Sequence, residues 1–257
     1  MTEVQITTPR GVRLAGTFVD PVDSTNAAVL FAHSFLADRH SGEHFDRLSA
    51  AYRGAGYATL EFDFSGCGDS DDDVITLASQ VEDLHSASAW LRAQGFDRQI
   101  LHAHSFGTLV ALKARPQAAK AMLLTGMITG PLSFEWDQIF SSTQLDDLER
   151  SGRAQIPDDT YSKREFFVIS KQTLIDLSMN EADDLLDDLS VPILAIYDAD
   201  DEQLGLVEMA QEEFARLPGG SRVEVVRGAR FGANEGVDTL RDMSVQWASR
   251  HVPVRVG

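Results

Sequence analysis

The feature that most constrains the fold of this chain is the short run around Ser105. The residues Ala103-His104-Ser105-Phe106-Gly107 follow an apolar segment typical of a buried strand and precede a helical pattern. Small residues two positions before and after a serine allow a sharp strand-to-helix turn that presents its hydroxyl as a nucleophile. Alanine at position 103 is the mildest replacement for the glycine that such turns usually carry. The alternative is that Ser105 only caps the following helix.

Strand and helix patterns alternate along most of the rest of the sequence. We expect strands at about 4–7, 12–19, 27–32, 57–62, 99–102, 121–125, 193–197 and 223–226, and helices at about 43–54, 77–91, after Ser105 and at 235–249. The first two strands form a hairpin around a Pro-Arg-Gly turn. The alternation predicts an α/β fold with a mostly parallel central sheet and helices on both faces.

Residues 127–190 interrupt this alternation. They contain short helical patterns, Pro131, Pro157 and the aromatic residues Phe134, Trp136, Phe140, Tyr161, Phe166 and Phe167. Because an insertion of this length between two sheet strands is usually functional, we expect a lid at 127–190 over a core of 1–126 and 191–257. The aromatics suggest an apolar or aromatic ligand, although packing of the lid on the core also explains them.

The composition limits which binding partners and which cellular compartment we expect for this protein. The 257 residues suit one large domain, and a formal net charge of −18 argues against nucleic acid or anionic membrane as a partner. Cys67 is the single cysteine, which excludes an internal disulfide and a cysteine-based zinc site. No signal-peptide pattern or membrane-length apolar run is visible, so we expect a cytoplasmic protein. The sequence leaves open whether the protein forms a homodimer.

Clustered charges and glycines elsewhere have mainly structural interpretations. Two acidic clusters are expected to be solvated faces, and neither has the spacing of a calcium-binding loop: Asp69, Asp71, Asp72 and Asp73, and Asp183, Asp184, Asp187 and Asp188. The glycine-rich run 62–70 predicts a tight turn after a strand. We find no recognisable set of metal ligands.

A second motif, Phe31-Ala32-His33-Ser34-Phe35, ends an earlier buried strand. In a turn of the Ser105 kind, one backbone N–H from the loop after that strand and one from the residue after the serine form an oxyanion hole. This geometry points to Phe35 and Phe106. A backbone donor does not depend on its side chain, so Ser34 in place of a usual glycine need not remove it.

With these motifs the chain resembles the serine α/β-hydrolases over nearly its whole length. The closest likeness is to cinnamoyl/feruloyl-esterase-like enzymes and the esterase half of OsmC fusions. The resemblance implies a Ser-His-Asp triad, hydrolysis of carboxylic esters and no cofactor. It places Ser105 on the nucleophile and Phe35 and Phe106 on the oxyanion donors.

The same resemblance indicates which residue is the triad acid, and it shows that this chain lacks the triad histidine of the family. The family pattern after the strand at 193–197 puts the acid at Asp201, with Asp198 and Asp200 as alternatives if the register slips. The family histidine follows the last strand in a Gly-Ala-x-His turn, where this chain has Gly-Ala-Arg-Phe and therefore Phe231. Phenylalanine cannot accept a proton, and losing one triad member commonly costs several orders of magnitude in turnover.

A substitute base would come from another histidine. His33 and His40, near the oxyanion loop, are the candidates we retain; the other five histidines are poorer. We therefore expect a serine-hydrolase-like enzyme with an incomplete triad, either an esterase or thioesterase or an acyltransferase. Its substrate would be a small apolar or aromatic carbonyl compound. The alternatives are an inactive ligand-binding or sensor protein and a non-hydrolytic acyltransferase, lyase or cyclase.

Overall fold

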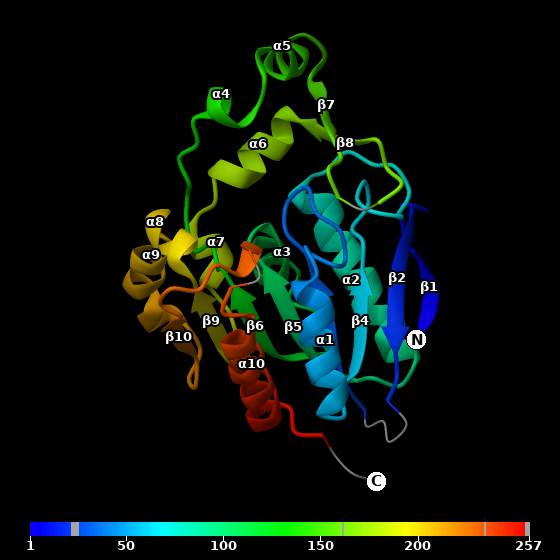
Figure 1. Ribbon diagram of the computed structural model, residues 1–257, viewed down its shortest axis with the longest axis vertical. Helices are drawn as coiled ribbons and strands as arrows, with labels where there is room; N and C mark the ends of the chain where they lie inside the picture. The colour runs from blue at the N-terminus through cyan, green and yellow to red at the C-terminus, as the bar shows by residue number, and fades with distance from the viewer. Residues whose placement is uncertain (22–25, 161, 234, 255–257) are drawn as a thin grey trace.

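A twisted sheet runs through the centre of the molecule (Figure 1). The structure is a computed structural model, and it describes residues 1–21, 26–160, 162–233 and 235–254. In this part of the chain the sheet has eight strands in the order β1-β2-β4-β3-β5-β6-β9-β10. Their bounds are β1 (Thr2–Thr7), β2 (Arg13–Val19), β3 (Ala27–Ala32), β4 (Ala58–Phe62), β5 (Arg98–His104), β6 (Ala119–Thr125), β9 (Ile193–Tyr197) and β10 (Arg222–Val225). The β1–β2 and β2–β4 pairs are antiparallel and the other pairs parallel.

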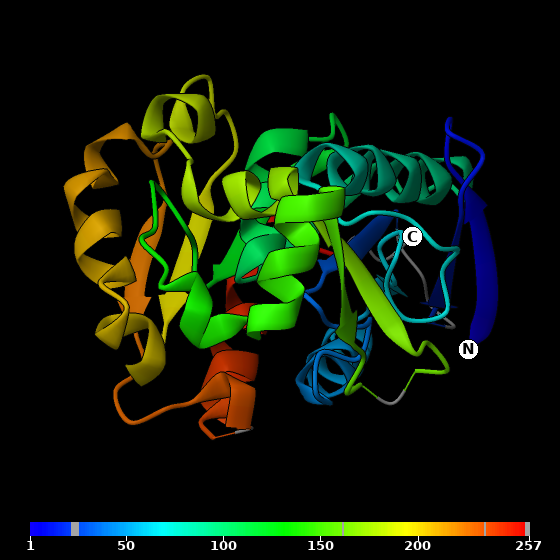
Figure 2. The same ribbon diagram turned by 90° about the horizontal axis from the view of Figure 1, so that it is seen from above.

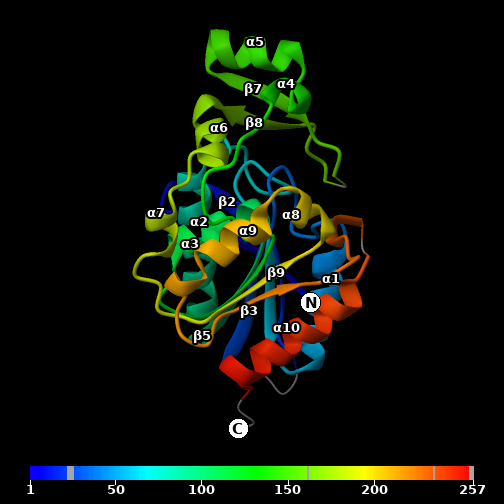
Figure 3. The ribbon, with the colours of Figure 1, turned by 90° about the vertical axis from the view of Figure 1, so that its left-hand side faces the viewer.

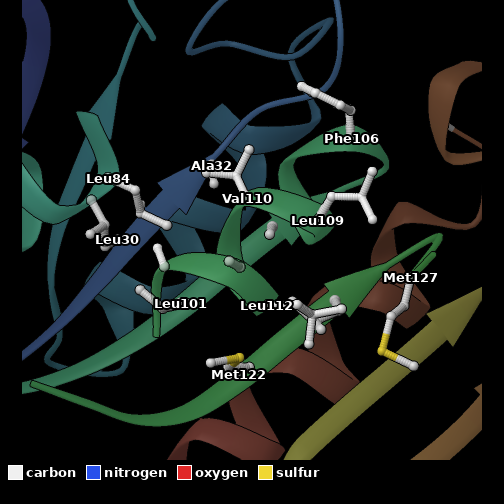
Figure 4. Packing of buried hydrophobic residues seen from close by; sticks show 14 of the residues in the cluster. Leu30, Ala32, Leu84, Leu101, Phe106, Leu109, Val110, Leu112, Met122 and Met127 are labelled. Carbon is white, nitrogen blue, oxygen red and sulfur yellow. The ribbon is translucent and has the colours of Figure 1, made fainter. Parts of the chain in front are cut away.

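Helices cover both faces of the sheet, as the sequence predicts (Figure 3). One face carries α1 (His44–Gly54) and α10 (Val237–His251), which contact each other, and the other carries α2 (Leu77–Ala93) and α3 (Phe106–Ala114). Strand β3 shows why both faces are apolar. Its residues are all buried and alternate between the two hydrophobic clusters, with Leu30 facing α2 and α3 and Phe31 facing α1 and α10. Figure 4 shows Leu30 beside Leu84, and Ala32 beside Val110, in the first cluster.

The expected strands and long helices are present, with ends that differ by a few residues. The sequence prediction missed one antiparallel hairpin, β7 (Arg153–Pro157) with β8 (Phe166–Ser170), inside the inserted segment. It also missed the short helices α8 (Ala199–Gln203) and α9 (Leu206–Glu212), which follow β9. These elements are short, and short elements give little periodicity for a pattern to detect.

The inserted segment stands above the carboxyl ends of the central strands (Figures 1 and 2). Besides the hairpin it forms α4 (Trp136–Ile139), α5 (Ser142–Ser151), α6 (Lys171–Ser178) and α7 (Ala182–Leu186). It is fixed to the loop that follows β4. The hydroxyl of Thr173 donates to the carbonyl of Ile75, Asp176 accepts the N–H of Leu77 at 2.7 Å, and Arg164 pairs with Asp72. The aromatic Tyr161 lies outside the described residues.

A buried carboxylate organises the glycine-rich turn after β4. Asp63 is 1 % exposed and accepts hydrogen bonds from the backbone N–H of Arg39 at 2.7 Å, from the Arg39 guanidinium at 2.5 Å and from the N–H of Asp69 at 2.9 Å. A Cβ on Gly68 would lie 2.3–2.5 Å from the Asp63 carboxylate, so only glycine fits there. Because Arg39 follows the β3 loop that carries Phe35, this turn also holds that loop in place.

No described helix is long and apolar enough to cross a bilayer. The acidic clusters lie beside arginines: Asp71 accepts from Arg13, and Asp183 and Asp187 accept from Arg216. Among the described residues, no three His, Cys, Asp or Glu side chains are arranged to hold a metal ion.

Candidate active site

The backbone at Ser105 is strained. This residue lies between β5 and α3 with φ 49° and ψ −118°, a conformation that non-glycine residues rarely adopt. Its N–H donates to the carbonyl of Thr125 on β6 at 2.8 Å, and its own carbonyl accepts from the N–H and hydroxyl of Thr108 at 2.8 and 2.6 Å. These bonds hold the turn on both sides. The Ser105 side chain makes no capping bond to α3, so the helix-cap alternative does not account for it.

Close packing at Gly107 brings α3 against the end of β3. A Cβ on Gly107 would lie 2.3 Å from the carbonyl oxygen of Ala32 and 2.5 Å from that of His33. The same approach brings together the two residues expected to form the oxyanion hole, because the rings of Phe35 and Phe106 lie 5.7 Å apart, edge to face. Phe106 is the first residue of α3, where a helix has free N–H groups and a positive dipole end.

Aromatic side chains of the inserted segment continue from this pair. Phe35 and Trp136 pack against a small buried cluster of the inserted segment, formed by Phe140, Leu148, Ala154 and Ile169. The rings of Phe134 and Trp136 lie 4.9 Å apart, and those of Trp136 and Phe140 lie 6.0 Å apart. Phe140 is buried within the segment, so part of this row is ordinary packing. The environment of the Phe35 loop is therefore aromatic on the side of the inserted segment.

Among the three carboxylates left open, Asp198 contacts the loop of residue 231. Asp198 is buried, and one of its oxygens accepts the backbone N–H of Phe231 at 2.7 Å while the other accepts the N–H groups of Asp200 and Asp201 at the start of α8. Asp201 turns back to accept the N–H of Asp198 at 3.0 Å, and burial raises the pKa of Asp201 to about 7. Asp200 lies 3.7 Å from Arg230. This geometry favours the Asp198 alternative over Asp201 as the acid.

Phe231 supplies no proton acceptor. It begins a 3-10 turn, η2 (Phe231–Ala233), in the connection between β10 and α10, and its ring is fully buried in the cluster beneath α1 and α10, with Leu240 and Ala229. Its backbone, not its side chain, contacts the carboxylate of Asp198.

Neither retained histidine has the properties of a general base. The Nε2 atom of His33 accepts the N–H of Phe64 at 3.1 Å, and its Nδ1 atom therefore donates to the carbonyl of Ser34 at 2.8 Å. This fully buried ring has no free lone pair. His40 is half-exposed and its Nδ1 lies 3.0 Å from Asp46, whose carboxylate raises the pKa of His40 to about 9. His40 is therefore protonated at neutral pH and cannot accept a proton there.

Three other histidines lie close together on the α1 side of the strand-to-helix turn at Ser105. The rings of His44 and His104 lie 5.0 Å apart, and His102 stacks on Phe31. The hydroxyl of Thr125 donates to the carbonyl of Ala103, so it accepts from Nδ1 of His104 at 2.9 Å. Burial lowers the pKa of all three histidines, and that of His44 falls to about 3. These rings are neutral at pH 7.

The neutral state of His44 predicts an acid-labile fold. Its pKa is about 6.5 in the unfolded chain and about 3 in the folded one, so between these values only the unfolded chain binds the proton. Stability therefore falls as pH decreases below 6.5. Between pH 6.5 and 4.5, His44 alone should lower the free energy of unfolding by about 2 kcal/mol. We therefore expect the stability of His44→Phe, measured by urea unfolding, to fall by about that much less over this pH range. Parallel pH profiles for the two proteins would contradict this expectation.

The strand order, the two-sided helical cover and the strained serine define an α/β hydrolase. The chain belongs to the alpha/beta hydrolase family, whose model matches residues 29–242. The predicted membership of the superfamily is thereby confirmed. The roles assigned to the oxyanion donors, the acid and position 231 stay predictions.

Solved structures similar to this chain share its fold, and they include an esterase domain and a dienelactone hydrolase. An esterase domain from Rhodothermus marinus is 25% identical with a TM-score of 0.68, and the match covers 98% of each chain. DcsB, solved with a substrate analogue, is 16% identical with a TM-score of 0.75 over 98% of this chain and 99% of that one. A dienelactone hydrolase from Anabaena variabilis is 18% identical with a TM-score of 0.65 over 99% and 98%. Among curated proteins, none matches the sequence. Family membership and the esterase neighbours support a hydrolase.

Proposed function

We propose that this protein is a serine-dependent enzyme that acts on a small apolar or aromatic ester, thioester or related carbonyl compound. The observation that carries the proposal is the strained backbone of Ser105, held between β5 and α3. Strain of this size persists only where the surrounding structure enforces it, and it is concentrated at functional sites. The likeness to the esterase domain from Rhodothermus marinus supports the same chemistry.

In the proposed reaction the Oγ atom of Ser105 attacks the carbonyl carbon. The carbonyl oxygen becomes an oxyanion that accepts from the N–H groups of Phe35 and Phe106. The carbon–oxygen or carbon–sulfur bond to the leaving group then breaks, and the proton from Ser105 ends on the leaving alcohol or thiol. Water releases the acyl group in hydrolysis, and a second alcohol or thiol releases it in acyl transfer.

The proton transfer has no imidazole at position 231, so we propose a route through water or the substrate itself. Oxyanion stabilisation and binding alone retain roughly 10³–10⁴-fold rate enhancement over water in serine hydrolases that lack triad members. The reaction proposed here is therefore slow, or it uses an acyl compound with a good leaving group. The aromatic row that begins at Phe134 and Trp136 is the proposed binding side for the apolar part of the substrate, under a lid formed by 127–190.

A fluorophosphonate reagent tests this proposal, because it phosphonylates only an activated serine. We expect one adduct by intact mass, and its loss in Ser105→Ala. Ser142→Ala, an exposed serine in α5, serves as a matched control and should label like the unaltered protein. An adduct that persists in Ser105→Ala would refute the role of Ser105.

A second candidate function is ligand binding without catalysis. The observation in its favour is that Phe231 is fully buried while His33 and His40 are each unable to act as a base. Under this hypothesis the folded protein gives no adduct, yet small aromatic carbonyl compounds raise its melting temperature equally in the unaltered protein and in Ser105→Ala. A lyase or cyclase that needs only electrophilic activation would also give no adduct, but it would convert its substrate.

A further inference from the structure

The carboxylate of Asp201 has one oxygen that the cap of α8 does not use. Its Oδ2 atom accepts the N–H of Asp198 at 3.0 Å, whereas no hydrogen bond or ion pair reaches its Oδ1 atom from the part of the chain that the structure describes. Asp198 differs, because both of its oxygens accept backbone N–H groups. Asp201 is also only half-buried. It is therefore the carboxylate of this pair that keeps a free acceptor.

This free oxygen lies at the end of β6, the strand next to the one that leads into Ser105. Oδ1 of Asp201 is 2.8 Å from the position that a Cβ on Gly126 would take. Gly126 directly follows Thr125, whose carbonyl accepts the N–H of Ser105 at 2.8 Å. Figure 3 shows α8 at the end of the sheet that faces the inserted segment. Asp201 therefore lies against the backbone that holds the turn at Ser105.

The surroundings make Asp201 a stronger base than an ordinary carboxylate. Burial raises its pKa to about 7, and the charges of Asp198 and Asp200 act in the same direction, against the hydrogen bond from the N–H of Asp198. From β9, Tyr197 is the other titratable group that interacts with it. No lysine or arginine of the described chain pairs with Asp201, since Arg230 contacts Asp200 instead. A base is most effective when its pKa lies close to the working pH.

We propose that Asp201 is the proton acceptor for Ser105 and that a water molecule carries the proton between them. This inference rests on the proposed function, since it assumes that Ser105 attacks a carbonyl carbon. In a Ser-His-Asp triad an imidazole connects the serine to the carboxylate. Here the ring of Phe231 is fully buried and has no acceptor atom, so water takes over that connection.

The proton moves twice in the proposed acylation. As the bond from Oγ of Ser105 to the carbonyl carbon forms, the hydroxyl proton passes to the water, a water proton passes to the carboxylate of Asp201, and the carbonyl π electrons move onto oxygen. When the carbonyl re-forms, the bond to the leaving group breaks. The carboxyl group then returns the proton through water to the leaving alcohol or thiol, so Asp201 ends as a carboxylate.

The pH dependence of fluorophosphonate labelling tests this role. Only the carboxylate form accepts a proton, so the labelling rate of the unaltered protein should rise with pH and level off above a midpoint near 7. Asp201→Asn keeps an oxygen for the N–H of Asp198, but its amide is not a base. It should label about 10²-fold more slowly at pH 8, with no midpoint near 7.

Two other carboxylates provide controls. Glu202→Gln removes an exposed carboxylate beside Asp201 in α8, and it should label like the unaltered protein. Glu61 is needed because burial raises its pKa to about 7 as well, although it lies on β4 against Ser49 of α1. Glu61→Gln should keep the midpoint near 7. Loss of that midpoint in Glu61→Gln, with Asp201→Asn unchanged, would assign the titration to Glu61 and overturn the inference.

Formate tests the same role without a change of pH. Asp201→Ala removes the carboxylate and leaves room for a small acid, so sodium formate should raise its labelling rate in proportion to concentration, relative to sodium chloride. Asp201→Asn fills the same space and should not respond. A structural role of Asp201 predicts no such rescue.

The possible failures are distinguishable. If Asp201→Asn labels at the unaltered rate and with the same midpoint, Asp201 is not the proton acceptor, while the role of Ser105 stands. If the unaltered protein gives no adduct at any pH, the proposed function fails and this inference fails with it.

Discussion

Replacing Asp63 with alanine is expected to lower the free energy of unfolding by about 3–5 kcal/mol. This is the typical cost of removing one partner of a buried ion pair, because the other charge stays buried without compensation. Asp63 is 1% exposed, and the Arg39 side chain that it neutralises is 10% exposed. The variant also loses the acceptor for the backbone N–H groups of Arg39 and Asp69.

Urea unfolding measures this effect, and Asp71→Ala is its matched control. Asp71 also pairs with an arginine, Arg13, but both side chains are substantially exposed. Exposed pairs contribute about 0–1 kcal/mol, so the control should lose no more than that. Similar losses in the two variants would show that burial does not decide the contribution of Asp63. Because Asp63 also holds the loop that carries Phe35, its variant should label more slowly at Ser105 even where it is folded.

Replacing Gly107 with alanine is expected to cost about 3 kcal/mol of stability and to abolish labelling of Ser105. The added Cβ would lie 2.3 Å from the carbonyl oxygen of Ala32 and 2.5 Å from that of His33, and both are backbone atoms that cannot rotate away. Overpacking of this kind costs about 1–3 kcal/mol and sometimes more. Relief requires α3 to move away from the end of β3, which separates the N–H groups of Phe35 and Phe106.

Gly54→Ala gives the control for this substitution. Gly54 is the last residue of α1, and a Cβ there would meet no atom within 4 Å. Alanine should therefore raise stability by up to about 1 kcal/mol through its higher helix propensity. Labelling at the normal rate in Gly107→Ala would contradict the proposal that the close approach of α3 and β3 forms the oxyanion hole.

The fold was predictable from the sequence because its strands are strongly patterned. The continuous apolar runs at 27–32 and 193–197 are typical of strands buried on both faces, and both strands appear with the predicted bounds. The hairpin of β7 and β8 was missed because its strands are five residues long and only part of each is buried. Short, half-exposed strands carry too few apolar residues to distinguish them from a loop.

The chemistry of the site was less predictable, since it depends on local geometry. The family spacing selected Asp201, with Asp198 as an alternative. Asp198 and Asp201 form a reciprocal cap at the start of α8 that leaves an oxygen of Asp198 for the Phe231 loop, while an oxygen of Asp201 lies beside Gly126 after β6, so the choice of the acid stays a prediction. The histidines illustrate the same limit. The sequence shows that His33 and His40 lie near the oxyanion loop, but the neighbours that neutralise one and protonate the other come from distant residues or from the folding of α1.

The contact between Asp198 and the backbone of Phe231 has a consequence for how such a chain can change. Every residue except proline has a backbone N–H, so other substitutions at position 231 keep the hydrogen bond between this loop and Asp198. The fold therefore does not depend on an imidazole to close this corner of the molecule. A substitution at position 231 keeps this backbone contact but loses the packing of a fully buried ring, so its effect on stability comes through the core and not through the Asp198 contact.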